Sequence, residues 1–183
     1  MPKPVAYKAG NGMHVNCSLT NTKGENVFYD ENDPMKLSLI CRKWISGIIT
    51  HAREFTAITN PTVNSYKRIV PGYEAPCYIC WSDANRSAMI RIPAVRGKGT
   101  RTEVRSVDAS ANPYLAFATI LSAGLRGIKE DYPLIAPVYD NIFEYTREER
   151  EQRGIKNLPE NLKDAVKELK NSKIGRASCR ERV

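Results

Sequence analysis

Two long stretches of this sequence place apolar residues at the spacing of a helix, and they constrain the fold more than any other feature. The first runs from Met35 to Phe55, and the second is expected from Asn112 to about Lys129. Asn112 suits the capping position of the second helix, and Pro113 suits its first turn. In the first helix, the residues that share one face are Leu37, Ile40, Cys41, Trp44, Ile48 and Ile49.

Shorter segments of strand-like character surround these two helices. They are Met13–Leu19, Cys77–Ser82, Ala88–Pro93 and Thr102–Val107. Two polar segments near the end of the chain, Thr146–Gln152 and Asn161–Lys170, have helical character. The order of strand, helix, strands and helix predicts an α+β fold.

The composition is that of a globular chain. Of the 183 residues, 42% are hydrophobic and 26% are charged, which excludes a disordered tail and suits one domain or part of a larger one. The longest nearly apolar run, Tyr114–Leu125, is too short to span a bilayer, and no secretory signal follows Met1. We therefore expect a soluble, cytoplasmic protein with no membrane partner.

The chain is basic, with 28 Lys and Arg against 20 Asp and Glu and a formal net charge of +8. Such an excess suits either a nucleic-acid surface or a site that holds phosphates and carboxylates. The arginines of the central region are spread along the chain and form no basic tract; they are Arg68, Arg86, Arg91, Arg96, Arg101 and Arg105. This spread favours an anionic small substrate, and nucleic acid is not an expected partner.

The five cysteines are an odd number, which argues against a disulfide framework. Cys77 and Cys80 have C-x-x-C spacing, which suggests redox or zinc chemistry. A second cysteine pair is missing, however, and only His14 and His51 could add nitrogen ligands. We expect these two cysteines to be strand residues with small side chains.

The end of the chain differs from the rest. Residues 174–183 continue no periodic pattern and match what a common short-read sequencing adapter would encode in one reading frame. We expect residues 1–173 to be the native portion and residues 174–183 to be a non-native tail; a basic disordered tail is the alternative.

Two clusters carry residues suited to chemistry in the first half of the chain. In one, Gly10-Asn-Gly12 precedes His14; a neutral imidazole is a good metal ligand, although a single histidine is more often structural. In the other, a turn at Pro71-Gly72 places Glu74 on a loop, where a carboxylate can close over a substrate or simply face solvent.

The third cluster is the most informative. Arg91 lies in an otherwise apolar strand, where a buried charge needs a partner or a ligand. Glu103 and Arg105 are two residues apart on a strand and so share a face. A carboxylate beside guanidinium groups suits a metal-bound, phosphate-bearing substrate, and a salt-bridged barrel wall is the alternative.

Several motifs resemble those of the type I, bacterial-type glutamine synthetases, in the C-terminal part of the catalytic domain. They are Met1-Pro-Lys-Pro4, Gly12-Met-His14, Thr59-Asn-Pro-Thr62, Asn64–Pro76, Asn85-Arg-Ser87, Ile90-Arg-Ile-Pro93, Glu103-Val-Arg105 and Asn112-Pro-Tyr-Leu115. They keep the family's order and nearly its spacing across residues 1–173. The resemblance implies a catalytic domain of the glutamine synthetase/guanido kinase type, with a curved antiparallel sheet and flanking helices, truncated at its N-terminal side.

The resemblance implies an ATP-dependent ligase that joins ammonium to L-glutamate through γ-glutamyl phosphate, with Mg²⁺ or Mn²⁺ and a homo-dodecameric assembly. A ligase of the same family that joins glutamate to polyamines or other amines is the alternative, and the Asn64–Pro76 motif favours glutamine synthetase. A silent scaffold or nucleic-acid-binding protein is a third possibility, but it leaves His14, Glu74 and Glu103 unexplained.

The resemblance also implies roles for single residues. The metal ligands are expected to be His14 and Glu103, and the catalytic residues Glu74 and Arg86. Glu74 corresponds to a flap glutamate that closes the site and helps to deprotonate ammonium, and Arg86 serves both ATP and the transition state. The expected substrate contacts are Gly10, Arg68, Glu74 and Arg105. The expected ATP contacts are Ser18, Arg86, Arg91 and Lys98.

Three positions depart from the family pattern. Ala9 replaces an asparagine, Asn16 replaces a histidine seen in many members, and Phe143 stands where adenylylated members carry tyrosine, so we expect no adenylylation there. The family's N-terminal domain and remaining metal-binding glutamates lie upstream of the position of Met1. The isolated chain is therefore expected to be inactive.

Overall fold

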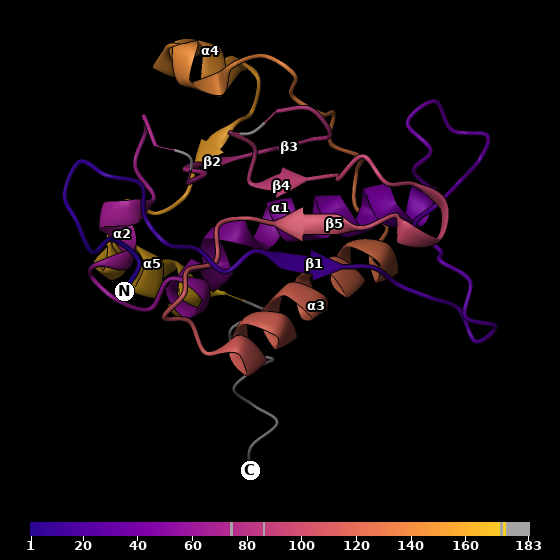
Figure 1. The fold of residues 1–183 in the computed structure, drawn as a ribbon, viewed down its shortest axis with the longest axis horizontal. Helices are drawn as coiled ribbons and strands as arrows, with labels where there is room; N and C mark the ends of the chain where they lie inside the picture. Colours follow the sequence, from indigo (N-terminus) through magenta and orange to yellow (C-terminus); the bar gives the residue numbers. More distant parts are fainter. Residues whose placement is uncertain (74, 86, 173, 175–183) are drawn as a thin grey trace.

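The computed structural model describes residues 1–73, 75–85, 87–172 and 174. Its strands form a four-stranded sheet and a separate two-stranded sheet. In Figure 1 the larger sheet lies in front of the first long helix, and the second long helix lies beneath the edge of that sheet. The expected α+β class is confirmed.

Helix α1 spans Leu39–Thr59, so it begins and ends a turn later than the apolar spacing predicts. The start is delayed because the Asp33 carboxylate accepts hydrogen bonds from backbone N–H groups of a turn that leaves Lys36 at a φ of 58°. Ser38 then caps the helix, since its side chain accepts the N–H of Cys41.

Helix α3 spans Pro113–Lys129, as the sequence predicts. The Asn112 side chain accepts the N–H of Tyr114 at 3.0 Å and of Leu115 at 3.3 Å, and Pro113 lies in the first turn, where no N–H is needed. These local contacts explain why sequence alone locates this helix correctly.

Helices α1 and α3 cross at a contact that only glycine permits. A Cβ atom at Gly47 would lie 2.2 Å from the Ala123 carbonyl oxygen, and one at Gly127 would lie 2.2 Å from the Lys43 carbonyl oxygen. Because backbone atoms oppose both positions, no side-chain movement could make room. The crossing fixes the helical layer on which the sheet rests.

The larger sheet has the strand order β1-β5-β4-β3. The bounds are Val15–Cys17 for β1, Trp81–Ser82 for β3, Ile90–Arg91 for β4 and Thr102–Val104 for β5. The pairs β1–β5 and β4–β5 are antiparallel, whereas β3 and β4 are parallel, so the sheet is mixed and not purely antiparallel.

The strands are shorter than the alternating segments predict. Pro93 follows β4 closely and has no N–H to continue a ladder. Beyond β5, the carbonyl groups of Arg105 and Ser106 accept hydrogen bonds from the Arg68 side chain. Side-chain contacts thus replace strand pairing next to the candidate site.

The segment predicted as one strand over Cys77–Ser82 contributes to both sheets. Its first part forms β2 (Tyr78–Ile79), which pairs antiparallel with β6 (Lys156–Asn157), and its second part forms β3. The remaining elements are α2 (Ser65–Arg68), η1 (Gly97–Gly99), η2 (Ile142–Glu144), α4 (Arg147–Gln152) and α5 (Leu162–Asn171).

The two polar helices near the end of the chain begin where the sequence predicts. Thr146 and Glu149 form a capping box at the start of α4, and the Asn161 side chain accepts the N–H of Asp164 at the start of α5. Among the described residues, no helix has both the length and the apolar character needed to cross a bilayer.

The core lies between the larger sheet and helices α1 and α3. Its largest fully buried side chains include Trp44, Trp81, Phe28, Phe55 and Ile120. Cys77 and Cys80 are also buried, without a disulfide, and burial raises the pKa of Cys77 to about 11 and that of Cys80 to about 12. This is the environment of packing residues, as expected, and not of reactive thiols.

Candidate active site

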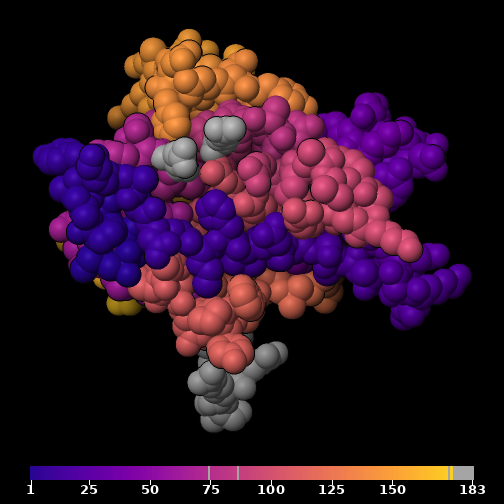
Figure 2. Space-filling view, in the orientation of Figure 1, coloured from indigo at the N-terminus to yellow at the C-terminus, as the bar shows by residue number. Residues whose placement is uncertain are grey.

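A cavity of about 260 Å³ brings together four of the residues predicted to serve the reaction. Gly10, His14, Arg68 and Arg105 line it, together with Ala9, Gly12 and Ala75. The N-terminal segment supplies much of this lining; in Figure 2 that segment, in indigo, crosses the front of the molecule from one side toward the middle. Residues far apart in the sequence therefore share one small basic cavity.

Beside this cavity, Glu103 connects the N-terminal segment to two strands of the sheet. Its Oε1 lies 2.8 Å from Nδ1 of His14, and its Oε2 lies 2.7 Å from Nε of Arg91. Arg91 on β4 is the cross-strand partner of Glu103 on β5. The Glu103 side chain is 7% exposed, against 39% for His14 and 40% for Arg91. A nearly buried carboxylate thus meets two partly exposed basic groups.

The pairing corrects one detail of the sequence analysis. Arg91 is partly exposed and not buried, and Glu103 is the partner that its charge was expected to need. The register of β4 against β5 places Arg91 opposite Glu103, which supports the alternative of a salt bridge within the sheet for these two residues. The rest of the Arg91 side chain remains accessible.

The His14–Glu103 pair suits part of a metal shell. A carboxylate oxygen is a ligand that Mg²⁺ and Mn²⁺ both prefer, and imidazole extends the choice toward Mn²⁺. Across the described part of the chain, no group of three or more His, Cys, Asp or Glu side chains is placed to hold a metal ion. The two residues fit a divalent ion as part of a ligand set and not as a complete one.

Arg68 is the most constrained cation of the cavity. It lies at the end of α2, is 3% exposed, and donates from Nη1 to the Ser106 carbonyl at 3.0 Å and from Nη2 to the Arg105 carbonyl at 3.1 Å. Burial lowers the pKa of Arg68, Asp108 opposes that shift, and Arg105 adds to it. A guanidinium held in this way presents fixed donors to an anion.

Arg105 is the second cation of the cavity. Its side chain is largely buried, and Nη1 donates to the Ala88 carbonyl at 3.3 Å. Glu103 bonds to His14, and His14 lines the cavity with Arg105, so both members of the predicted Glu103–Arg105 pair lie at this site.

Of the residues predicted to contact ATP, Ser18, Arg91 and Lys98 do not line this cavity. Ser18 lines a different, mostly apolar hollow of about 430 Å³ between β1 and α3. Lys98 lies in η1 and is exposed, and Arg91 reaches the site only through Glu103. Glu74 and Arg86, the two predicted catalytic residues, lie outside the described residues.

Asp108, which the sequence does not single out, is fully buried next to the site. Its Oδ1 accepts the N–H and the hydroxyl of Ser110, both at 2.7 Å, and its backbone bridges to Gly12. Burial raises the pKa of Tyr66, and the Asp108 charge raises it further. The sequence carries a signal for Gly12, as the second glycine before His14, but none that distinguishes Asp108 from a loop aspartate.

The other histidine is structural. His51 is 4% exposed; its Nδ1 lies 2.9 Å from a Glu54 carboxylate oxygen, and its Nε2 lies 2.9 Å from the Tyr132 hydroxyl. These contacts tie α1 to the segment after α3, away from the cavity of Arg68.

Comparison with known proteins places this geometry in a family. A family profile described as glutamine synthetase, catalytic domain, matches residues 1–183. A glutamine synthetase of Methanosarcina mazei is 55% identical over 183 residues, which are 100% of this chain and 41% of the relative. A glutamine synthetase of Thermotoga maritima is 55% identical over 174 residues, which are 95% of this chain and 39% of the relative.

Solved structures agree in fold. The structure titled "GmaS/ADP complex-Conformation 1" superposes with a TM-score of 0.82 at 36% sequence identity, and covers 95% of this chain and 40% of that one. A structure titled "Apo GmaS without ligand" gives 0.78 at 35% identity, over 97% of this chain and 39% of that one. The chain thus spans about two fifths of the length of the relatives it matches. Since the family profile extends over residues 1–183, the chain belongs to the glutamine synthetase family, as part of its catalytic domain.

Proposed function

We propose that this chain forms part of a glutamine synthetase that ligates ammonium to L-glutamate with ATP, through a γ-glutamyl phosphate intermediate. The observation that carries the proposal is the convergence of Arg68, Arg105 and the His14–Glu103 pair on one small cavity. Relatives named glutamine synthetase are 55% identical to the chain, which supports ammonium as the acceptor.

In this proposal the two buried arginines bind the anionic parts of the substrate. The guanidinium of Arg68 is held by backbone carbonyl groups, so little freedom is lost when it binds a carboxylate. Arg105 lies at the same cavity and would neutralise charge on the glutamate and on its phosphorylated form. Gly10 lines the cavity without a side chain and leaves room for the substrate.

His14 and Glu103 would supply two ligands of a bound Mg²⁺ or Mn²⁺ ion. When bound, such an ion neutralises charge on transferring phosphates. The near burial of Glu103 keeps its carboxylate in one place, and the ion pair with Arg91 orients the oxygen that does not bond to His14. The ion would therefore meet a carboxylate whose position the sheet has already fixed.

The remaining roles extend the proposal from the family resemblance. Glu74 closes the site against water and accepts a proton from ammonium, and Arg86 stabilises the phosphoryl group in transfer. Ser18, Arg91 and Lys98 contact ATP, and the whole protein is a cytoplasmic homo-dodecamer. Residues 1–173 are its native catalytic portion, and residues 174–183 are a non-native tail.

The test is a chimaera in which residues 1–173 replace the matching segment of the Methanosarcina mazei relative. Phosphate release from ATP is measured with L-glutamate and with ammonium, methylamine or putrescine as the acceptor. We expect release that depends on ammonium. Release only with the larger amines would identify an amine ligase instead, and no release with any acceptor, from a correctly assembled chimaera, would contradict the proposal.

A single substitution tests the site within the same assay. Glu103→Ala in the chimaera should reduce turnover by at least about a hundredfold, because removal of one preorganised electrostatic group typically costs that much. Glu148→Ala is the matched control, since this carboxylate lies on exposed α4 and should leave turnover unchanged. Full activity and unchanged metal dependence in Glu103→Ala would show that Glu103 is not part of the active site.

A further inference from the structure

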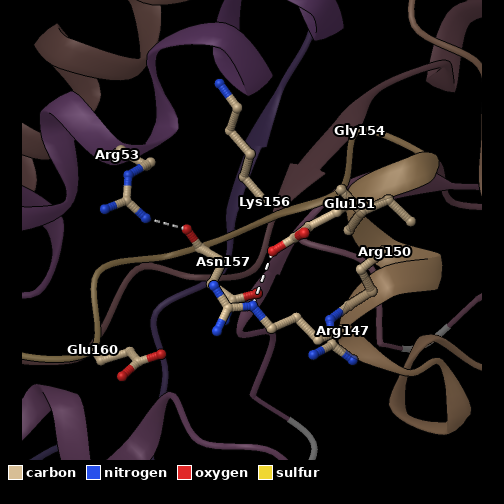
Figure 3. Close-up of a pocket in the computed structure, with 9 residues that line it drawn as sticks. Arg53, Arg147, Arg150, Glu151, Gly154, Lys156, Asn157 and Glu160 are labelled. Carbon is tan, nitrogen blue, oxygen red and sulfur yellow. Dashed lines mark hydrogen bonds and ion pairs between the residues drawn. The ribbon is translucent and has the colours of Figure 1, made fainter.

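Positive charge gathers in a hollow between α1, α4 and β6, apart from the candidate active site (Figure 3). Arg53 and Arg147 in this hollow form ion pairs with glutamate side chains, at 2.8 Å and 2.9 Å. Lys156 points away from Arg150. The cations of the hollow therefore do not converge on one point. Lys3 differs from them, because it is nearly buried and its contacts lie beside the candidate active site.

The side chain of Lys3 is enclosed by the protein. The residue is 8% exposed, its Nζ donates to the Lys8 carbonyl, and the same Nζ lies 3.6 Å from the centre of the Tyr73 ring. A carbonyl oxygen and an aromatic face both attract a cation, so together they replace part of the water lost on burial. Lys3 thus joins two segments that are far apart in the sequence.

The backbone of Lys3 is fixed as well. Its N–H donates to Oδ1 of Asn64 at 2.7 Å, and its carbonyl accepts a hydrogen bond from Nδ2 of the same side chain at 3.0 Å. The neighbouring carbonyl of Pro2 accepts the N–H of Asn11 at 2.8 Å. The side chain of Lys3 therefore extends from a part of the chain that cannot shift without the loss of several hydrogen bonds.

Both partners of the Lys3 ammonium group adjoin the cavity of the candidate active site. Lys8 directly precedes Ala9, which lines the cavity, and Tyr73 stands two residues before Ala75, which also lines it. Lys3 accordingly fastens the loop that carries Tyr73 and Ala75 to the N-terminal segment. The link joins two walls of one cavity.

We propose that Lys3 is a positioning residue, which holds the loop of Tyr73 and Ala75 against the N-terminal segment and so shields the cavity from water. The inference rests on the proposed function, in which γ-glutamyl phosphate is exposed to any water that enters. Attack of water on its γ-carbonyl carbon breaks the bond to the phosphate oxygen and returns glutamate and phosphate, without glutamine. A loop held in place therefore favours transfer to ammonia over hydrolysis.

The first test does not depend on turnover. The dilute 183-residue chain is acetylated with the N-hydroxysuccinimide ester of acetic acid, and mass spectrometry follows each lysine. Lys3 should react at least about tenfold more slowly than exposed Lys8, because its amine is enclosed. Tyr73→Ala should speed the reaction of Lys3 at least about threefold, since a cation–π contact is lost. Tyr73→Phe keeps the ring and should leave both rates unchanged. Equal rates at Lys3 and Lys8, or no effect of Tyr73→Ala, would overturn the proposal.

The second test compares phosphate released with glutamine formed in the chimaera. Lys3→Met removes the ammonium group and keeps a side chain of similar length. It should raise the ratio of phosphate to glutamine at least about twofold, because loss of the contact favours loop arrangements that admit water. Lys8→Met is the matched control, since the side chain of Lys8 is exposed and the carbonyl that contacts Lys3 is retained. A merely structural role would lower phosphate and glutamine together and leave the ratio unchanged.

Tyr73→Ala tests the same contact in the chimaera should Lys3→Met fail to assemble, because Tyr73 is only half-buried. An unchanged ratio in the assembled variants would overturn the shielding role. Absence of glutamine from the unsubstituted chimaera would instead contradict the proposed function, and the acetylation rates would then decide by themselves whether Lys3 holds the loop.

Discussion

At the scale of single residues, the candidate site depends on groups that leave space as much as on groups that bind. Gly12 is the clearest case, because a Cβ atom there would lie 2.3 Å from Nη2 of Arg68. Arg68 is in turn held by two carbonyl groups, so its position and the absence of a side chain at Gly12 are coupled.

We therefore expect Gly12→Ala to shift the Arg68 guanidinium without unfolding the protein, since only the end of a flexible side chain opposes the new atom. In the chimaera, the KM for glutamate should rise at least about tenfold, because a charged hydrogen bond to the substrate is lost or weakened. Steady-state kinetics measure this. Asn11→Ala, at the exposed neighbouring position, should leave KM unchanged. Equal KM values for the unsubstituted chimaera and both variants would show that Gly12 does not affect substrate binding.

The buried cysteines give a second prediction at this scale. Burial raises the pKa of Cys41 and of Cys80 to about 12, so their thiols stay protonated and unreactive at pH 8. Unfolding returns them to an ordinary pKa and increases the thiolate fraction. In a Cys179→Ser background, we expect iodoacetamide to modify them at least about tenfold faster in guanidinium chloride than in the folded chain. Equal rates in both conditions would show that these cysteines are not buried.

At the scale of elements, the crossing of α1 and α3 sets the layer that supports the sheet. Backbone atoms approach on both sides of the contact between Gly47 and Gly127, so helix separation there is determined by the lack of side chains. The spacing of apolar residues predicts both helices, but it does not predict how closely they approach.

Gly47→Ala should destabilise the chain by about 1–3 kcal/mol, because the added methyl group would lie 2.2 Å from the Ala123 carbonyl oxygen and must separate the helices. Urea unfolding measures the change in free energy. Thr50→Ala, on the exposed side of the same helix, controls for helix propensity and should change stability by no more than about 0.5 kcal/mol. A neutral or stabilising Gly47→Ala would contradict the close crossing.

At the scale of the whole molecule, one side of the described structure carries apolar surface. Phe117, Leu121 and Leu125 follow one another along α3 at helical spacing and are 50%, 45% and 45% exposed. Strand β1 stands at the end of the strand order, and Phe117 and Leu121 line the hollow beside it. Such a surface favours association with other chains.

The isolated chain should therefore aggregate, and Leu121→Glu/Leu125→Lys should reduce aggregation because it replaces exposed apolar surface with charge. Light scattering against concentration measures the effect. Thermal unfolding should change little, since both side chains are substantially exposed. Because the double variant adds one negative and one positive charge, the net charge is unchanged, and a fall in scattering reflects the lost apolar surface. Unchanged scattering in the double variant would show that this face does not drive association.

A second prediction for the whole molecule concerns activity. The 183-residue chain should show no ATP-dependent release of phosphate with glutamate and ammonium, because the described residues offer only a partial ligand set for the divalent ion. The chimaera supplies the comparison under the same conditions. Turnover by the isolated chain at a rate similar to that of the chimaera would contradict this expectation.

Features that depend on neighbouring residues can be predicted from the amino-acid sequence alone. Asn112 and Pro113 specify where α3 begins through contacts within one turn. The apolar spacing of α1 places Cys41, Trp44 and Ile48 correctly on its buried face, whereas Ile40, predicted on the same face, is 39% exposed. The motif Asn64–Pro76, together with the other motifs that resemble the family in the same order, identified the family, because their residue types and order are specific.

The contacts between these parts depend instead on how the whole chain folds. His14 and Glu103 are 89 residues apart, and their contact depends on the register between β1 and β5 and on the path of the N-terminal segment. The division of Cys77–Ser82 between two sheets depends on the distant β6 strand. The burial of Asp108 and the close approach of Arg68 to Gly12 are likewise tertiary features. Local periodicity cannot specify such contacts, because their free energy comes from surfaces that become adjacent only when the chain folds.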